Sequence, residues 1–156
     1  MNSYVTDAEA EAYFDGDPRA DTFLEDENFS WYLSRATKII DSLPLKGTKY
    51  LRDGTQALQF PREYDDGHYD ADEATGSAEV PMAVKEACCE EALAIFLQGT
   101  TGGRRELQEA GVQSYSIGGK LQETFAPGAA TRTKGLRSPY AYRLLSHYIA
   151  RAVPIK

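Results

Sequence analysis

One segment, residues 81–99, most constrains the fold, because its apolar residues recur at helical spacing over its whole length. Pro81 stands at a favoured first position of a helix, and Gly99 ends the pattern. On a helical wheel Ala92 lies between the two neighbouring cysteines, so both can face a core. We therefore predict a buried central helix, with an apolar side formed by Val84, Cys88, Cys89, Ala92, Leu93, Ile95 and Phe96.

Three further helices are predicted from caps and apolar stripes. Thr6, followed three residues later by Glu9, is the capping-box pattern that begins a helix. Apolar residues at steps of four and three predict a second helix over about 28–42. Ser138 as N-cap and Pro139 at the first position predict the last helix. The expected fold class is mainly α, a small bundle of about four helices.

The chain between the third and last helices is predicted to hold a long loop or a β-hairpin. Residues 112–117 and 120–125 are typical of strands, and Gly118-Gly119 between them suits a two-residue turn. Neither face of this hairpin is cleanly apolar, so we expect another subunit to complete it. Residues 62–79 are acidic and lack an apolar period, which predicts an exposed, mobile loop.

The length of 156 residues fits a single domain, which we place at residues 1–150. Residues 151–156 include Pro154 and are expected to form an extended tail. No apolar run approaches the roughly 20 residues of a membrane span, and no signal peptide is evident. Cys88 and Cys89 are adjacent, a poor arrangement for a fold-closing disulfide, so we expect buried thiols in a reducing cytosol.

Charge is divided unevenly along the chain. The net charge is −7, yet no Asp or Glu follows Glu123, and the last 33 residues carry six basic side chains. The first 123 residues therefore carry −13. Such asymmetry marks either an end that meets an acidic partner or an end that offsets the acidic body of its own or a neighbouring subunit. The acidic body argues against binding of the whole molecule to double-stranded DNA.

We find no catalytic constellation in the sequence. The acidic run 65–73 around His68 lacks the ligand spacing of a calcium loop, and residues 99–105 lack the lysine of a phosphate-binding loop. His147 and the pair Glu90-Glu91 are expected on solvent-exposed helix faces. The sequence therefore predicts neither an enzyme nor a metal or cofactor site.

Aromatic residues gather near the basic end. The chain has ten tyrosines and one tryptophan, and aromatic rings among basic side chains can stack single-stranded nucleic acid. The same residue types are enriched at protein–protein interfaces. Given the acidic body, we favour interfaces for Tyr115, Tyr140, Tyr142 and Tyr148. The single-strand-binding alternative would need Tyr115, Tyr140 and Tyr142 beside Arg132, Lys134 and Arg137.

Over about residues 3 to 150 the chain resembles the head–tail connector, or head-completion adaptor, proteins of long-tailed phages. The resemblance rests on short pieces in order. These are Tyr4-Val5-Thr6 with Ala10, Ala12, Tyr13 and Phe14; residues 35–41; Gln56-Ala57-Leu58-Gln59-Phe60-Pro61-Arg62; Val80-Pro81 with Val84-Lys85-Glu86-Ala87 and Glu90-Glu91-Ala92; residues 112–125; and Ser138 to Tyr148. Some similar sequences are likened instead to a primosomal single-strand-binding protein, which keeps a nucleic-acid-binding alternative open.

The resemblance implies a structural virion protein of the neck, assembled in the bacterial host cytoplasm. Its subunits would form a ring of twelve under the portal protein, extend the channel for genomic DNA and meet a stopper or tail-completion protein. The implied portal-docking residues are Arg143, His147, Arg151, Val153, Pro154, Ile155 and Lys156. Tyr115, Ile117, Leu121 and Phe125 would contact neighbouring subunits or the tail side, and Arg132, Lys134 and Arg137 would lie near the DNA.

Overall fold

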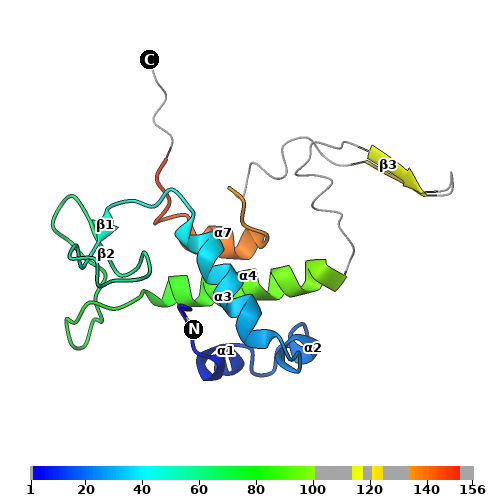
Figure 1. Ribbon diagram of the computed structural model, residues 1–156, viewed down its shortest axis with the longest axis horizontal. Coiled ribbons are helices and arrows are strands. Elements are labelled where there is room, and N and C mark those ends of the chain that lie inside the picture. Colours follow the sequence, from blue (N-terminus) through cyan, green and yellow to red (C-terminus); the bar gives the residue numbers. More distant parts are fainter. Residues whose placement is uncertain (1, 101–113, 118–120, 125–133, 152–156) are drawn as a thin grey trace, which may run out of the picture.

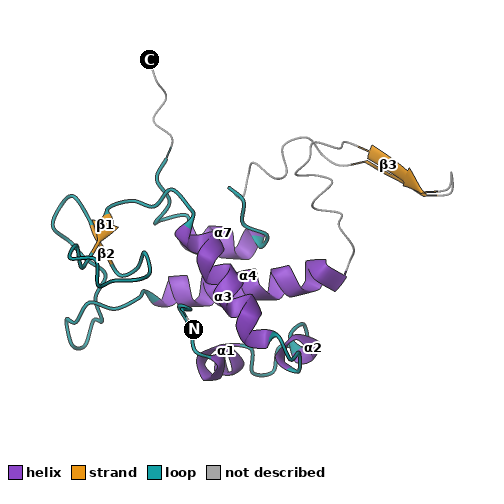
Figure 2. Cartoon of the chain, viewed as in Figure 1, coloured by secondary structure: helices purple, strands orange, loops and turns teal. Residues whose placement is uncertain are grey.

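The computed structural model describes residues 2–100, 114–117, 121–124 and 134–151, and this part of the chain is mainly helical (Figures 1 and 2). The expected mainly α class is confirmed, with five helices in this part of the chain where about four were expected. No helix among the described residues is long and apolar enough to cross a bilayer. The helices are α1 (Asp7–Tyr13), α2 (Asp21–Leu24), α3 (Phe29–Asp41), α4 (Met82–Thr100) and α7 (Pro139–Leu145), and the strands are β1 (Thr48–Lys49), β2 (Arg62–Glu63), β3 (Ser114–Ile117) and β4 (Leu121–Thr124).

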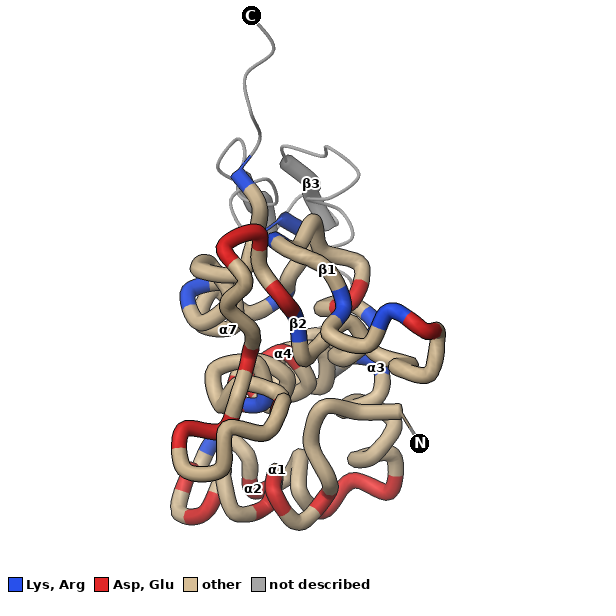
Figure 3. Tube along the Cα trace, turned by 90° about the vertical axis from the view of Figure 1, so that its left-hand side faces the viewer, with Lys and Arg blue, Asp and Glu red and all other residues tan. Residues whose placement is uncertain are grey.

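Helix α4 is the centre of the fold, as predicted. Its most extensive contacts are with α3 and α7, which lie on opposite sides of it in Figure 3. A helix that packs on several sides must be apolar nearly all round. All seven residues predicted to form its apolar side are buried, together with Ala87.

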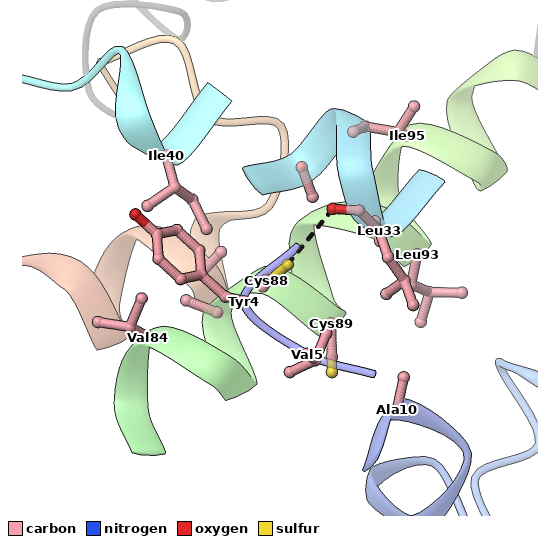
Figure 4. Packing of buried hydrophobic residues seen from close by; sticks show 14 of the residues in the cluster. Tyr4, Val5, Ala10, Leu33, Ile40, Val84, Cys88, Cys89, Leu93 and Ile95 are labelled. Atoms are coloured by element: carbon pink, nitrogen blue, oxygen red, sulfur yellow. Dashed lines mark hydrogen bonds between the residues drawn. The ribbon is translucent and has the colours of Figure 1, made fainter. Parts of the chain in front are cut away.

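Both cysteines are buried in the core, where Cys88 faces α3 and Cys89 lies beside Val5 on the side of α4 nearer α1 (Figure 4). The thiol of Cys88 donates to the backbone oxygen of Leu33 at 3.5 Å. It also lies 3.3 Å from the hydroxyl of Thr37, itself buried. Both thiols are free, so Cys88 and Cys89 act here as small core residues.

The predicted caps are confirmed at α1 and α7. The backbone N–H of Glu9 donates to the Thr6 hydroxyl at 3.2 Å, and the Glu9 carboxylate accepts the Thr6 backbone N–H at 2.8 Å. Ser138 Oγ accepts the N–H of Ala141 at 3.1 Å, with Pro139 at the first position of α7. The short helix α2 was not predicted from the sequence.

Helix α7 ends at Leu145. Its apolar stripe in the sequence runs further, through Ala141, Leu144, Leu145, Tyr148 and Ile149, and predicted a longer helix. The chain turns there because its next residues pair with the segment that follows α3. Ile149 forms an antiparallel bridge with Leu45. The N–H of Lys46 donates to Tyr148 O at 2.8 Å, and the N–H of Ala150 donates to Pro44 O at 2.7 Å.

The expected hairpin is present as β3 paired antiparallel with β4, but in a different register. Ile117 pairs with Leu121, so the connection spans residues 118–120 and not only Gly118-Gly119. Three-residue loops are common in hairpins, and a shift by one residue exchanges the faces of a strand. The sequence pattern did not distinguish the two registers.

Most residues of the acidic segment 62–79 are exposed, as expected, but two buried side chains attach the segment to the body, which the sequence did not predict. Arg62 and Asp70 are buried, and the N–H of Arg62 donates to the Asp70 carboxylate at 2.8 Å. The Arg62 guanidinium also donates to the backbone oxygens of Lys46 at 2.7 Å and Gly47 at 2.6 Å. Gly47 has a positive φ of 70°, and a Cβ there would lie 2.2 Å from Glu63 O. Any larger residue at position 47 would therefore separate β1 from β2.

Candidate functional site

The basic end of the chain is anchored to the core by one buried carboxylate. Glu91, on α4, is 0% exposed. Its two oxygens accept the backbone N–H of Arg137 at 2.8 and 2.9 Å, and Oε2 also accepts the N–H of Ser138 at 2.8 Å. Three charge-assisted hydrogen bonds to the residues just before α7 fix where that helix begins. The expectation that Glu91 lies on a solvent-exposed face was wrong.

Glu90 is also buried, although it too was expected at the surface. Its carboxylate accepts the Tyr13 hydroxyl at 3.1 Å and pairs with the guanidinium of Arg19 at 3.2 Å. Burial, together with the Glu90 charge, raises the pKa of Tyr13. Tyr13 on α1 and Arg19 in the α1–α2 turn thus supply the polar contacts that Glu90 would otherwise make with water. These contacts attach α1 and the turn to α4.

Helix α7 presents an aromatic ring and a guanidinium together on its outer side. Tyr140 is 46% exposed, and the guanidinium carbon of Arg143 lies 5.9 Å from the centre of its ring. The spacing of three residues places both on one face of the helix, while Ala141 and Leu145 are buried on the other. This geometry is a cation–π contact. It offers an adjacent flat ring and fixed positive charge to a partner.

The predicted cluster of basic and aromatic residues is only partly assembled. Lys134 is exposed, and its ammonium donates to Ala150 O at 3.2 Å. Arg137 turns toward α4 and donates to the side-chain oxygen of Gln98 at 3.1 Å. Tyr142 packs partly against the core and does not join Tyr140 at the surface. Arg132 lies outside the described residues.

Of the residues assigned to portal docking and to subunit contacts, the structure describes only some. Arg143, His147 and Arg151 are exposed around the end of α7. Tyr115 and Ile117 lie on β3 and Leu121 lies on β4. The remaining residues of these two sets, Val153, Pro154, Ile155, Lys156 and Phe125, lie outside the described part of the chain.

Both histidines line one open cleft beside the end of α7. The cleft has a volume of about 430 Å³. Nothing in the sequence joins His68 to His147, because they are far apart along the chain. The bridge between Leu45 and Ile149 places His147 beside the segment after α3, and the pairing of β1 with β2 brings the segment of His68 to the same cleft. The lining is of mixed charge and consists of Lys46, Tyr64, Asp66, His68, Asp70, His147 and Tyr148.

The carboxylates of the acidic run mostly serve local turns. Asp66 accepts the backbone N–H of His68 at 3.0 Å, and Asp72 accepts the N–H of Thr75 at 2.7 Å. The Thr75 hydroxyl, followed by this N–H, lowers the pKa of Asp72. Over the residues that the structure describes, no three acidic, histidine or cysteine side chains converge as a metal site would require. Residues 101–105 of the glycine-rich stretch are not described.

Four exposed residues around α7 form what we call the α7 surface: Lys134, Tyr140, Arg143 and Arg151. Figure 3 shows Lys and Arg segments near α7 and at the described end of the chain. From the sequence, Tyr140 was assigned to the basic and aromatic cluster and Arg143 to portal docking. Their spacing of three residues on a predicted helix is the signal that joins them.

A family model described as "Putative DnaT-like ssDNA binding protein" matches residues 1–155. No curated protein matches the chain, and no solved structure does. The family match corrects the resemblance to phage head–tail connectors, which rested on short pieces. It therefore overturns the connector, adaptor, neck and portal-binding interpretation, and with it the assignment to the virion. It favours the nucleic-acid-binding alternative.

Proposed function

The chain belongs to the family of DnaT-like single-stranded-DNA-binding proteins, and we propose that it binds single-stranded DNA through the α7 surface. The observation that carries this proposal is the exposed pair of Tyr140 and Arg143 on α7, with the guanidinium carbon 5.9 Å from the centre of the ring. Proteins that bind single strands without sequence preference combine stacking aromatic rings with cations that follow the backbone. The role proposed is binding without catalysis, as expected from the sequence.

Each residue of the α7 surface has a distinct part in this proposal. An unpaired base stacks on the exposed ring of Tyr140, and the guanidinium of Arg143 contacts the adjoining phosphate or the far side of the base. Lys134 and Arg151 supply further positive charge for phosphates. Residues 124–156 contain six basic side chains and no acidic one, a composition that suits contact with a polyanion.

The negative charge of the rest of the molecule favours binding of a single strand over binding of a duplex. The first 123 residues carry −13, which would repel a wide duplex lying across the body. A single strand is narrower and more flexible than a duplex, so it can contact Tyr140 and Arg143 without lying across the whole acidic body. The small bundle of helices around α4 supplies a rigid support for this contact, with Glu91 fixing the start of α7.

Binding of labelled oligo(dT), followed by fluorescence anisotropy at several salt concentrations, tests the proposal. Tyr140→Ala removes a stacking ring, so affinity should fall by about 1–3 kcal/mol, or roughly 5- to 150-fold. Arg143→Ala should reduce the slope of log K against log salt by about 0.7 for each phosphate that the guanidinium no longer neutralises.

A matched pair of controls lies elsewhere on the surface. Tyr50 is an exposed tyrosine with Arg52 two residues on, and neither belongs to the α7 surface. Tyr50→Ala and Arg52→Ala should leave the affinity unchanged. Equal reductions of affinity in both pairs, or unchanged binding by the α7 variants, would contradict the proposal.

A further inference from the structure

The open cleft lined by His68 and His147, which we call the histidine cleft, contains rings that have no polar partner in the protein. Neither imidazole has a hydrogen-bond partner within the described residues. Only their backbones are held: Asp66 accepts the N–H of His68 at 3.0 Å, and the ammonium of Lys46 donates to His147 O at 2.6 Å. Both rings are therefore held in place by their backbones and remain available to a ligand.

One wall of the histidine cleft is a flat aromatic surface. The rings of Tyr64 and His68 are nearly parallel, with an angle of 27° between their planes and their centres 6.4 Å apart. A tight turn holds them, in which the N–H of Tyr64 donates to His68 O at 2.7 Å. The Tyr64 hydroxyl donates to the buried carboxylate of Asp70 at 2.9 Å, which fixes its ring. A preformed wall of this kind can stack a flat heterocycle with little loss of conformational entropy.

The charges around the histidine cleft favour an uncharged ring inside it over a phosphate. Two carboxylates, those of Asp66 and Asp70, line the cleft together with one ammonium, that of Lys46. A nucleobase is uncharged, and its edge carries N–H and acceptor groups that imidazole nitrogens and a carboxylate can pair with. The volume of about 430 Å³ lies within the usual range for sites that hold a small molecule.

The histidine cleft also continues the outer stripe of α7. Tyr140, Arg143 and His147 follow one another at steps of three and four residues, the spacing of one helix face. Although α7 ends at Leu145, one further turn follows, in which the N–H of Ile149 donates to Leu145 O at 3.2 Å. At the helical rise, His147 lies about 10 Å beyond Tyr140. A strand of about three nucleotides covers that distance at its stacked spacing.

We propose that the histidine cleft holds one unpaired base of the same DNA strand that contacts the α7 surface. The base stacks on the wall formed by Tyr64 and His68, and its edge pairs with the His147 imidazole and the second carboxylate oxygen of Asp66. Its phosphate stays at the rim, near Lys46. This inference rests on the proposed function and adds a second stacking site to it. A free mononucleotide has the same chemistry but lacks the neighbouring nucleotides that reach the α7 surface.

Proton NMR of the full chain tests the proposal, because the chain has two histidines and both line the cleft. The ring C–H signals of both should shift saturably with oligo(dT), at the concentrations at which fluorescence anisotropy shows binding. The mononucleotide dTMP should shift the same signals only at concentrations roughly 100-fold higher or more, since it gains nothing from a second contact.

Substitutions give an independent readout. His68→Ala removes half of the stacking wall and should weaken oligo(dT) binding by about fivefold or more. His147→Ala should also weaken it, through loss of a partner for the base edge. Tyr50→Ala, which removes an exposed ring outside the cleft, is the matched control and should leave the affinity unchanged. Unchanged circular dichroism spectra show that the variants are folded.

The outcomes separate this inference from the proposed function. Unshifted histidine signals in a complex that anisotropy shows to have formed, or full affinity in either histidine variant, would overturn the inference and leave the proposed function standing. Equal potency of dTMP and oligo(dT) would also overturn it, because the cleft would then be a site for free mononucleotides. A wild-type protein that does not bind oligo(dT) at all would refute the proposed function itself.

Discussion

The carboxylate of Glu91 accepts the backbone N–H of Ser138 at 2.8 Å, joining residues 47 positions apart in the chain. The same carboxylate accepts the N–H of Arg137. Glu91 is fully buried, so its charge is compensated by backbone donors at the start of α7. The central helix thereby determines where the α7 surface begins.

Replacing Glu91 should destabilise the fold and disturb the α7 surface. Glu91→Ala leaves two N–H groups without this acceptor, which should lower the free energy of unfolding by about 2–4 kcal/mol. Glu91→Gln retains one carbonyl oxygen and should be less destabilising. Urea unfolding measures both, with the exposed Glu11→Ala as control, expected within about 0.5 kcal/mol of wild type. A stable Glu91→Ala protein would show that these bonds contribute little.

Leu93 and Phe96 on α4 belong to the buried core. The ring of Phe96 packs against those of Phe23 and Tyr32, with ring centres 5.3 Å and 5.6 Å apart. Leu93→Ala should cost about 2–5 kcal/mol and Phe96→Ala about 3–5 kcal/mol in unfolding free energy, since each leaves a cavity. Met82→Ala, at an exposed position on the same helix, is the matched control. Similar midpoints for all three variants would place the core elsewhere.

Stability should decline in alkaline solution. Burial raises the pKa of the Cys88 thiol from 9.0 to about 11. The unfolded chain therefore releases this proton first, and stability is full below about pH 9 and falls as pH rises toward 11. Burial also raises the pKa of Tyr4, which extends the decline. Urea unfolding over this range should show a shallower fall for Cys88→Ala, and an identical slope would exclude the thiol as a cause.

Local signals in the sequence predicted the helix starts well. The capping box of Thr6 and Glu9 and the Ser138-Pro139 start act within one turn, so adjacent residues carry the whole signal. The seven apolar residues of α4 were likewise identified from their period. These features depend on neighbours in the chain, and neighbours are what a single sequence displays.

Long-range pairing could not be predicted in this way. Glu91 has the sequence appearance of a surface carboxylate, because the backbone N–H groups that it binds leave no side-chain signal. Arg62 was assigned to an exposed loop for the same reason, since its acceptors are backbone oxygens of Lys46 and Gly47. For the candidate site, the sequence identified Tyr140 and Lys134 but separated them from Arg143.

The backbone pairing of the segments after α3 and α7 has a mechanical consequence. Ala150 donates to Pro44 O, and Leu45 bridges Ile149. Tension applied at the carboxyl end of the chain therefore reaches the end of α3 through this ladder before it can unwind α7. Under load, the backbone hydrogen bonds between residues 44–46 and 148–150 are stretched first, and α7 keeps its shape until these bonds break.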